Sequence, residues 1–223
     1  MDIKKLLGDE AAKYVENNMI VGLGSGTTVN YLVRALGDRV QEGLQIKAVS
    51  SSEKTRRLAE EVGISLVDLN MIEQIDLTID GANEIERDTL FAIKGGGGSL
   101  LYEKIVTAHS KKVIWIIDED KLVSQLGKFR LPVEVIPYGC QRLFRMFYEK
   151  QFNPVLRIGH DDELFVTDGG HWIIDLYLES INHPTELADW LKSLTGVVEH
   201  GLFLHCVDTV LVGNNNQIRV IEK

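Results

Sequence analysis

Short apolar runs alternate with amphipathic patterns over roughly the first 120 residues of the chain. Apolar runs of the buried-strand type lie at residues 19–23, 46–50, 64–69, 75–80 and 113–118. Between these runs, apolar residues recur at the spacing of one helix face. Strands that alternate with helices predict a parallel α/β sheet, because each parallel pair needs a crossover connection.

Capping residues mark the helix boundaries in this first part. An apolar face that begins at Ile3 predicts an N-terminal helix, and a glycine turn precedes a second helix from about Thr28. A third helix is expected between Ser52, a typical N-cap, and Gly63, a typical C-terminal stop. A fourth helix follows a run of glycines and extends to about His109.

The pattern changes in the second half of the chain. Residues 130–137 are expected to form an edge strand, because prolines bracket them and proline cannot donate a ladder hydrogen bond. Helices are predicted over residues 139–150 and from Pro184, which stands in the first-turn position that proline favours. Residues 164–170 and 171–178 resemble the two strands of a hairpin.

Further strands complete the predicted architecture. They are expected at residues 154–159, 201–205, 209–213 and 218–222, the last three of which can rejoin the first sheet. We therefore predict a mostly parallel, Rossmann-like sheet flanked by helices, with a smaller inserted α+β domain. The catalytic α/β domain is expected to comprise residues 1–127 and 201–223, and the smaller domain residues 128–200.

Composition narrows the class of protein. The net charge is −9, which disfavours a binder of nucleic acid or of an anionic membrane, since both need a basic surface. Cys140 and Cys206 are isolated, which is typical of free thiols in a reducing compartment. The first residues lack a signal-peptide apolar core, and the longest apolar strand run is too short to span a bilayer. A cytoplasmic protein without a nucleic-acid or membrane partner is expected.

The turn over residues 22–28 joins the first strand to the second helix. It departs from the dinucleotide-binding fingerprint, because Thr27 stands where a third glycine is needed and the next strand ends in serines. Backbone N–H groups and hydroxyls at a helix start suit a single phosphate. These groups belong to Ser25, Gly26, Thr27 and Thr28. A tight turn with hydroxyl caps remains an equal alternative.

Asp80 stands at the end of an apolar strand, where ligands bind in parallel α/β sheets. Gly81 and Ala82 leave space beside it, and Asn83 and Glu84 follow. The alternative is a polar turn in which Asp80 bonds its own backbone. The turns at 22–28 and 80–84 and the loop at 94–98 are all expected on one edge of one sheet.

The stretch "KGGGGSLLYEKI" combines a charge, bare backbone and a carboxylate. Lys94 precedes four glycines, Ser99 is a possible cap, and Glu103 falls in the first turn of the next helix. A partly desolvated carboxylate has a raised pKa, which suits it to moving protons. The alternative is a solvated glutamate that the helix dipole favours.

Metal and nucleophile signatures are missing from the sequence. The six histidines lack ligand spacing, and no serine or cysteine nucleophile motif is present. The motifs together predict proton transfer on a small phosphorylated compound, without metal or cofactor.

The motifs "IVGLGSGTT", "TIDGANEI", "IKGGGGSLLYEKI", "LGKFRLPVEVIP" and "GVVEHGLF" closely resemble those of the A-type ribose-5-phosphate isomerases, in the same order over nearly the whole chain. The resemblance implies interconversion of ribose 5-phosphate and ribulose 5-phosphate in the pentose phosphate pathway, with no cofactor. It also implies a homodimer or homotetramer, with the smaller domain often at the interface.

The resemblance also implies residue roles. Glu103 would carry the proton between C1 and C2 through a cis-enediolate, and Asp80 would move hydroxyl protons and open the furanose ring. Lys94 with the amides of Gly95, Gly96 and Gly97 would stabilise the enediolate oxygen. The substrate-binding set would be Lys4, Ser25, Gly26, Thr27, Thr28, Asp80, Gly81, Ala82, Asn83, Lys94, Gly95, Gly96, Gly97 and Lys121. The family motif often has aspartate where this chain has Asn83, and an amide cannot accept a proton as a carboxylate does. We therefore expect Asn83 to bind substrate only.

Two other functions use similar folds. A non-catalytic sugar-phosphate sensor would need an appended DNA-binding segment, and none is apparent in the sequence. A CoA transferase or a sugar-phosphate deaminase is the third possibility, and a transferase would use a glutamate as nucleophile.

Overall fold

The computed structural model describes residues 2–159, 162–215 and 217–223. By its internal contacts the chain divides into two compact units. The first comprises Met1–Ala82, Tyr102–Leu122 and Cys206–Lys223, and the second comprises Asn83–Leu101 and Val123–His205. The predicted domain limits, 1–127 plus 201–223 and 128–200, stay a prediction; the contact units differ from them chiefly in grouping residues 83–101 with the second unit.

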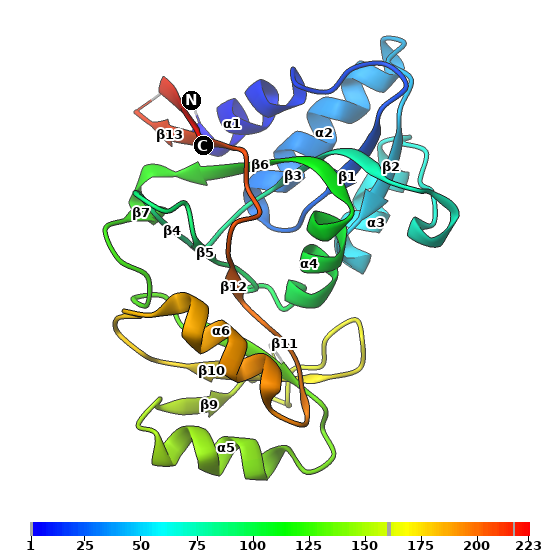
Figure 1. Cartoon of the computed structure of the whole chain (residues 1–223). Coiled ribbons are helices and arrows are strands. Elements are labelled where there is room, and N and C mark those ends of the chain that lie inside the picture. The colour runs from blue at the N-terminus through cyan, green and yellow to red at the C-terminus, as the bar shows by residue number, and fades with distance from the viewer. Residues whose placement is uncertain (1, 160–161, 216) are drawn as a thin grey trace. The chain divides into compact units, whose positions relative to one another are not determined.

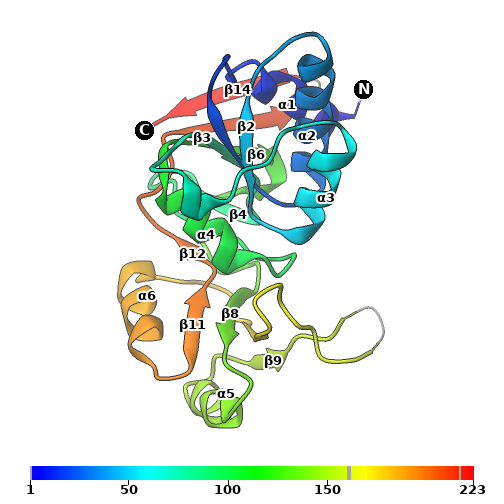
Figure 2. The same cartoon turned by 90° about the vertical axis from the view of Figure 1, so that its right-hand side faces the viewer.

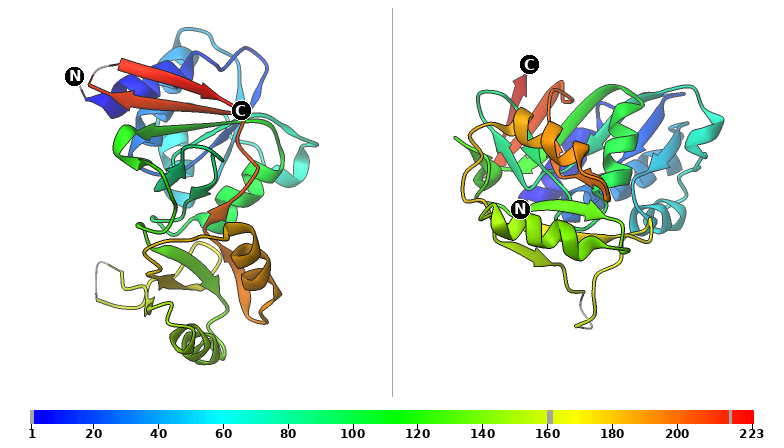
Figure 3. Two further views of the ribbon diagram at one scale, coloured as in Figure 1. Left: turned by 60° about the vertical axis from the view of Figure 1, so that its left-hand side comes forward. Right: turned by 60° about the horizontal axis from the view of Figure 1, so that its bottom comes forward.

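The first unit is built on a six-stranded sheet in the order β14-β13-β6-β3-β1-β2 (Figure 1). Its strands are β1 (Ile20–Leu23), β2 (Lys47–Ser50), β3 (Ile75–Asp80), β6 (Ser110–Asp118), β13 (Thr209–Asn214) and β14 (Gln217–Glu222). All neighbouring pairs are parallel except β13 with β14, the antiparallel pair drawn in red in Figure 3. The predicted α/β class with a mostly parallel sheet is confirmed, and β13 and β14 rejoin this sheet as expected.

Helices cover both faces of this sheet. The helices α1 (Ile3–Ala12), α2 (Thr27–Gln41) and α3 (Glu53–Glu61) lie on one face (Figure 2) and share its apolar core with β1. The helix α4 (Leu100–Ala108) begins in the second unit and continues into the first, where Val106 packs with Val49 and Ile75 on the other face. Among the described residues, no helix has the length and apolar character needed to cross a membrane.

The caps of α3 confirm the sequence prediction. The hydroxyl of Ser52 accepts a hydrogen bond from the backbone N–H of Thr55 at 3.1 Å, and Gly63 follows the helix with φ +82°. That φ lies in the left-handed region that glycine tolerates at a helix end.

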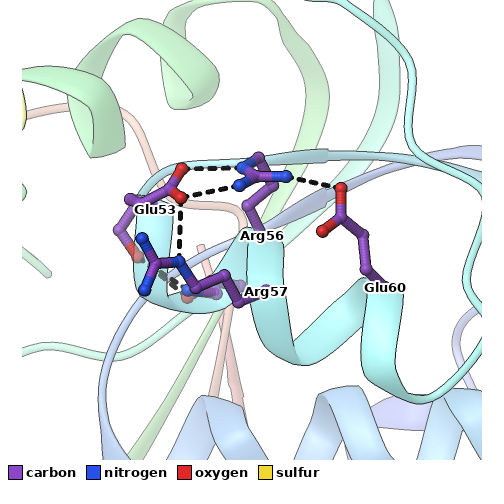
Figure 4. Close-up of polar contacts among 6 residues, drawn as sticks. Glu53, Arg56, Arg57 and Glu60 are labelled. Atoms are coloured by element: carbon purple, nitrogen blue, oxygen red, sulfur yellow. Dashed lines mark hydrogen bonds and ion pairs between the residues drawn. The ribbon is translucent and has the colours of Figure 1, made fainter.

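Charged side chains link the first turns of α3 (Figure 4). Glu53 accepts hydrogen bonds from Arg56 at 2.6 and 2.7 Å and from Arg57 at 2.9 Å, and Arg56 also reaches Glu60 at 2.5 Å. The hydrogen bonds from Arg56 and then Arg57 lower the pKa of Glu53 to about 2. The Glu53 and Arg56 side chains are 41% and 42% exposed, so this network adds little to stability.

The second unit contains two smaller sheets. One is antiparallel, in the order β11-β8-β10-β9, and comprises β8 (Leu131–Val135), β9 (Pro154–Leu156), β10 (Trp172–Leu176) and β11 (Val197–His200). The helices α5 (Cys140–Glu149) and α6 (Pro184–Ser193) share one apolar core with β8 and β10. The other sheet has the order β12-β5-β4-β7, with β4 (Glu84–Glu86), β5 (Ala92–Ile93), β7 (Leu122–Val123, which crosses the unit boundary) and β12 (Leu202–Phe203).

The prediction of an edge strand at residues 130–137 is wrong. The strand β8 lies between β11 and β10 and pairs with both. Pro132 is its second residue and Pro137 lies beyond its end, so residues 133–135 keep their N–H groups for pairing on both sides. The carbonyl of Pro132 still accepts a hydrogen bond from Gly201 at 2.8 Å.

The predicted hairpin of residues 164–170 with 171–178 is also wrong. A tight turn does form, because Gly170 donates to the carbonyl of Thr167 at 2.9 Å. The N–H of Thr167 also donates to the carbonyl of His171 at 2.9 Å, but no strand pairing continues from there. Instead, β10 pairs with β8 and β9, and Leu164 forms an isolated bridge with Ile158. The turn signal was local and correct, whereas the strand partner is fixed by distant apolar residues.

Three other predicted strands are shorter than expected, and the first of them, residues 154–159, yields only β9 (Pro154–Leu156). Residues 64–69 form only one bridge, between Leu66 and Ala48, before the 3₁₀ helix η1 (Leu69–Met71). Asp68 caps that turn by accepting from the N–H of Asn70 at 2.8 Å, which ends the extended segment. Residues 201–205 yield only β12, which pairs with β5 and does not rejoin the first sheet.

The packing of α2 generates a stability prediction. Leu32 is fully buried in the core that α1 and α2 share, so Leu32→Ala should lower the free energy of unfolding by about 2–5 kcal/mol. Arg34→Ala, on the exposed face of the same helix, should change it by less than about 0.5 kcal/mol. Urea denaturation of both variants measures the difference, and equal losses would contradict this packing.

Candidate functional site

The carboxyl ends of the parallel strands in the first unit gather most of the predicted site residues. β1, β3 and β6 run parallel and end at Leu23, Asp80 and Asp118. Ligands bind at this edge in sheets of this class. The turn after β1 leads into α2, and the 3₁₀ helix η2 (Glu119–Lys121) follows β6, so Lys121 lies at the same edge.

The turn before α2 leaves backbone donors at the helix start. Gly26 is the N-cap with φ +110°, and no side chain caps the helix there. The hydroxyl of Ser25 pairs with that of Ser51 at 2.9 Å instead. The first alternative, a cradle of N–H groups, therefore fits better than a turn closed by hydroxyl caps.

Lys4 brings a positive charge to the same place. Its Nζ donates to the Oγ1 of Thr27 at 3.3 Å, across from α1 to the first residue of α2. A cation beside a helix N-terminus favours binding of an anion by both groups together. The structure thus brings together Lys4 and the turn residues, which are 20 or more positions apart in the sequence.

Asp80 is buried and held by the same turn. It is 1% exposed, and its Oδ1 accepts hydrogen bonds from the N–H of Ser25 at 2.9 Å and of Gly81 at 2.7 Å. The alternative of bonding to its own backbone is therefore partly correct. The hydrogen bond from Ser25 links the carboxylate of Asp80 to the turn at residues 22–28, which is the candidate phosphate-binding turn.

Gly24 is a site residue that the sequence analysis missed. A Cβ on Gly24 would lie 2.0 Å from the carboxyl carbon of Asp80, so only glycine leaves room for that carboxylate. The carbonyl of Gly24 accepts from the hydroxyl of Thr55 on α3 at 2.9 Å. The sequence signal for this role is the first glycine of "GSGTT", which stands directly before Ser25.

Glu103 lies in the first turn of α4, as predicted. It is 5% exposed, so the alternative of a solvated glutamate is wrong. A buried carboxylate has less water to stabilise its charge, which is the setting in which proteins use carboxylates as general bases. Glu103 and Asp80 both belong to the first unit.

The loop of Lys94 and the glycines belongs to the second unit. It follows β5, which pairs antiparallel with β4 and β12, so the expectation that it lies on the same sheet edge as Asp80 is wrong. Lys94 is 1% exposed, and its Nζ lies 5.3 Å from the ring centroid of Phe203, within cation–π range. Its N–H donates to the carbonyl of Gly201 at 2.9 Å, which fixes the start of the loop.

Asn83 acts on the loop itself. Its Oδ1 accepts the N–H of Gly96 at 2.9 Å. Of the three loop amides expected to face an oxyanion, that of Gly96 is therefore already engaged. For the N–H groups of Gly95 and Gly97 there is no acceptor within the part of the chain that the structure describes.

A cavity of about 790 Å³ opens beside this loop within the second unit. Its lining includes Gly96, Gly97, Arg130, Arg157 and Phe165. Small-molecule sites have volumes of about 300–1,000 Å³, so the loop faces a space of suitable size. Within residues 2–159, 162–215 and 217–223, no group of three histidine, cysteine or acidic side chains is arranged to hold a metal ion.

The sequence is similar to one family of known proteins over most of its length. Residues 47–217 match the family model of ribose 5-phosphate isomerase A, also called phosphoriboisomerase A. The chain is 52% identical over 214 residues to ribose-5-phosphate isomerase A of Enterococcus faecalis, covering 96% of this chain and 94% of that protein. It is 49% identical over 221 residues to the Bifidobacterium adolescentis protein of the same name, covering 99% and 95%.

Solved structures agree with the sequence relatives. The fold is similar to ribose 5-phosphate isomerase A from Methanocaldococcus jannaschii, with a TM-score of 0.95, 38% identity, and coverage of 100% of this chain and 99% of that one. The Neisseria gonorrhoeae structure has a TM-score of 0.91 and 36% identity, covering 99% and 96%.

The contact between Lys4 and Thr27 generates a binding prediction. Lys4→Met should weaken binding of inorganic phosphate by about tenfold or more, because it removes the ammonium beside Thr27 that would give the bound anion a charge-assisted hydrogen bond. Lys5→Met is the matched control, since Lys5 is exposed and pairs with Asp9 on the same helix. Titration calorimetry compares the two, and equal phosphate affinity in both variants would remove Lys4 from the anion site.

Proposed function

Because this chain belongs to the ribose 5-phosphate isomerase A family, we propose the residue roles by which it interconverts ribose 5-phosphate and ribulose 5-phosphate. The chain is an aldose–ketose isomerase of the pentose phosphate pathway. A related structure with a TM-score of 0.95 and 33% identity was solved with phospho-erythronic acid, an acid analogue of a sugar phosphate. That complex favours a catalytic site over a non-catalytic sensor.

Burial of Glu103 is the observation that carries the proposed mechanism. We propose that its carboxylate removes the C2 proton of the open-chain aldose and returns it to C1 of the cis-enediolate. The 5% exposure of Glu103 supports this role, because a desolvated carboxylate is a stronger base than a solvated one. A positioned base of this kind contributes about 10²–10⁴ in rate.

The enediolate oxygen needs donors that are fixed before the reaction. Lys94 and the amides of the glycine loop are proposed to supply them. Lys94 is buried, and its backbone is anchored to Gly201, so little reorganisation would accompany the reaction. Preorganised donors of this type often account for the largest part of catalysis.

The phosphate is proposed to bind where α2 begins. Ser25, Gly26, Thr27 and Thr28 supply N–H groups and hydroxyls, and Lys4 and Lys121 supply positive charge. The phosphate lies far from the reacting carbons, so its binding energy can hold the open-chain sugar in place.

Asp80, Asn83 and their neighbours are proposed to act on the sugar hydroxyls. Asp80 would accept a hydroxyl proton during ring opening, while Gly81 and Ala82 leave space for the sugar. Asn83 would bind a hydroxyl through its amide nitrogen, because its oxygen is bonded to Gly96. An amide cannot take a proton, so proton transfer stays with Asp80 and Glu103.

Assembly and location are further proposals. We propose a homodimer or homotetramer formed through the second unit, where Ile136, Tyr138 and Tyr148 are 40%, 96% and 71% exposed. The two free cysteines, Cys140 and Cys206, support a reducing compartment such as the cytoplasm.

Removing the base tests the mechanism directly. In a coupled assay on metal-stripped protein, Glu103→Gln should abolish conversion of ribose 5-phosphate while substrate still binds, because the amide keeps the shape but cannot accept the proton. Glu61→Gln, exposed on α3, is the control and should retain full activity. Near-normal turnover by Glu103→Gln would exclude Glu103 as the base. In a separate experiment, the wild type is incubated with an acyl-CoA and hydroxylamine, and trapping of an acyl group from the protein would indicate a transferase instead.

Removing the cation tests the oxyanion site. Lys94→Ala should lower kcat at least about tenfold, since loss of one oxyanion donor typically costs 10²–10³. Steady-state kinetics separate kcat from KM. An effect confined to KM would make Lys94 a binding residue only.

A further inference from the structure

The carbonyl side of the glycine loop is held by a buried ion pair that no role assigned above includes. Arg157 follows β9 and is 7% exposed, and Asp175 in β10 is 3% exposed. The guanidinium is forked onto the carboxylate: Nε donates to Oδ2 at 2.9 Å and Nη2 donates to Oδ1. The remaining nitrogen, Nη1, donates to the carbonyls of Gly95 at 2.9 Å and Gly96 at 3.1 Å.

The sheet places this pair on the side away from the helices. Alternate residues of a strand point to opposite faces. Ile174 and Leu176 of β10 pack in the core with α5 and α6, so Asp175 points to the other face. The glycine loop lies on that face too, because a Cβ on Gly98 would come within 3.6 Å of the Cδ1 of Ile173.

Peptide geometry turns these carbonyl contacts into a constraint on the loop donors. In a trans peptide the C=O and the next N–H point in opposite directions, and the described residues contain no cis peptide. Holding the Gly95 carbonyl on Arg157 therefore directs the Gly96 N–H away from the guanidinium, and that N–H is bonded to Asn83. Holding the Gly96 carbonyl in the same way directs the Gly97 N–H away from Arg157.

Glycine is required by this arrangement. A Cβ on Gly96 would lie 2.6 Å from the Nδ2 of Asn83, and one on Gly98 would lie 2.4 Å from the ring of Phe165. A Cβ on Gly97 would meet no atom within 4 Å, so space beside that residue is open. The loop is thus fixed at Gly96 and Gly98 and open at Gly97.

We propose that Arg157, held by Asp175, is a positioning residue of the isomerase. It orients the Gly95–Gly96 and Gly96–Gly97 peptides so that the Gly97 N–H is presented to the enediolate oxygen, while the Gly96 N–H stays on Asn83. Arg157 acts through the loop, and the inference rests on the proposed role of the loop amides. Lysine cannot replace it, because a single ammonium lacks the planar fork that holds a carboxylate and two carbonyls together.

The test compares Arg157→Lys and Arg157→Met with Arg145→Lys and Arg145→Met, the latter pair on the exposed face of α5. We expect both Arg157 variants to lose about tenfold or more in kcat, because the Gly97 N–H would no longer be aligned with the enediolate oxygen. KM should stay within about threefold of the wild-type value, because the proposed phosphate site at the start of α2 is unchanged. Affinity for phospho-erythronic acid should fall in the same proportion as kcat/KM, while affinity for inorganic phosphate should stay unchanged. The Arg145 variants should behave as the wild type.

Asp175→Asn is a second variant, which keeps the side-chain volume but removes the charge that holds Arg157. It should also lower kcat, and circular dichroism should show that it remains folded. Folded Arg157→Lys and Asp175→Asn proteins with wild-type kcat and analogue affinity would overturn the proposal. So would a loss of phosphate affinity that parallels the loss of kcat, because it would indicate general disruption. If the wild type turns over ribose 5-phosphate and Lys94→Ala is impaired, either of these outcomes removes only the positioning role of Arg157. If the wild type is inactive, the proposed function itself fails.

Discussion

Burial of charge beside bare backbone is the constraint on which the rest of this structure depends. Asp80, Lys94 and Glu103 are each at most 5% exposed. Charged groups are costly to bury unless hydrogen-bonding partners replace water. Close backbone approach supplies part of that replacement: the amides of Ser25 and Gly81 bond Asp80, and this is possible because its neighbour Gly24 has no side chain.

The same constraint links structure to catalysis. Isomerisation through an enediolate is accelerated by a base held in position and by an oxyanion site whose donors are already oriented. Glu103 meets the first requirement by its position in the first turn of α4. The glycine loop meets the second if its peptides are fixed, which the bonds from Arg157 and to Asn83 accomplish. Glycine costs conformational entropy, but at Gly96 and Gly98 a side chain would collide with Asn83 or Phe165, so the loop needs glycine at these two positions.

Features encoded locally could be predicted from the sequence, and features that depend on distant pairing could not. The cap at Ser52 and the helix start at Pro184 follow from a few neighbouring residues, and the structure has both. The pairing of β8 on both sides is decided by strands far along the chain, so Pro132 misled the assignment of an edge. Arg157 was missed for the same reason, since it reaches the loop across 62 positions of sequence.

The central claim, that a carbon-bound proton moves by way of a base and an enediolate, is tested most directly by following deuterium from C2 of labelled ribose 5-phosphate in ordinary water. The account predicts slower turnover of the labelled sugar and progressive loss of deuterium to the solvent as aldose and ketose interconvert. Complete retention of deuterium, shared between C1 of the ketose and C2 of the aldose after many interconversions, would show direct hydride transfer and contradict the account.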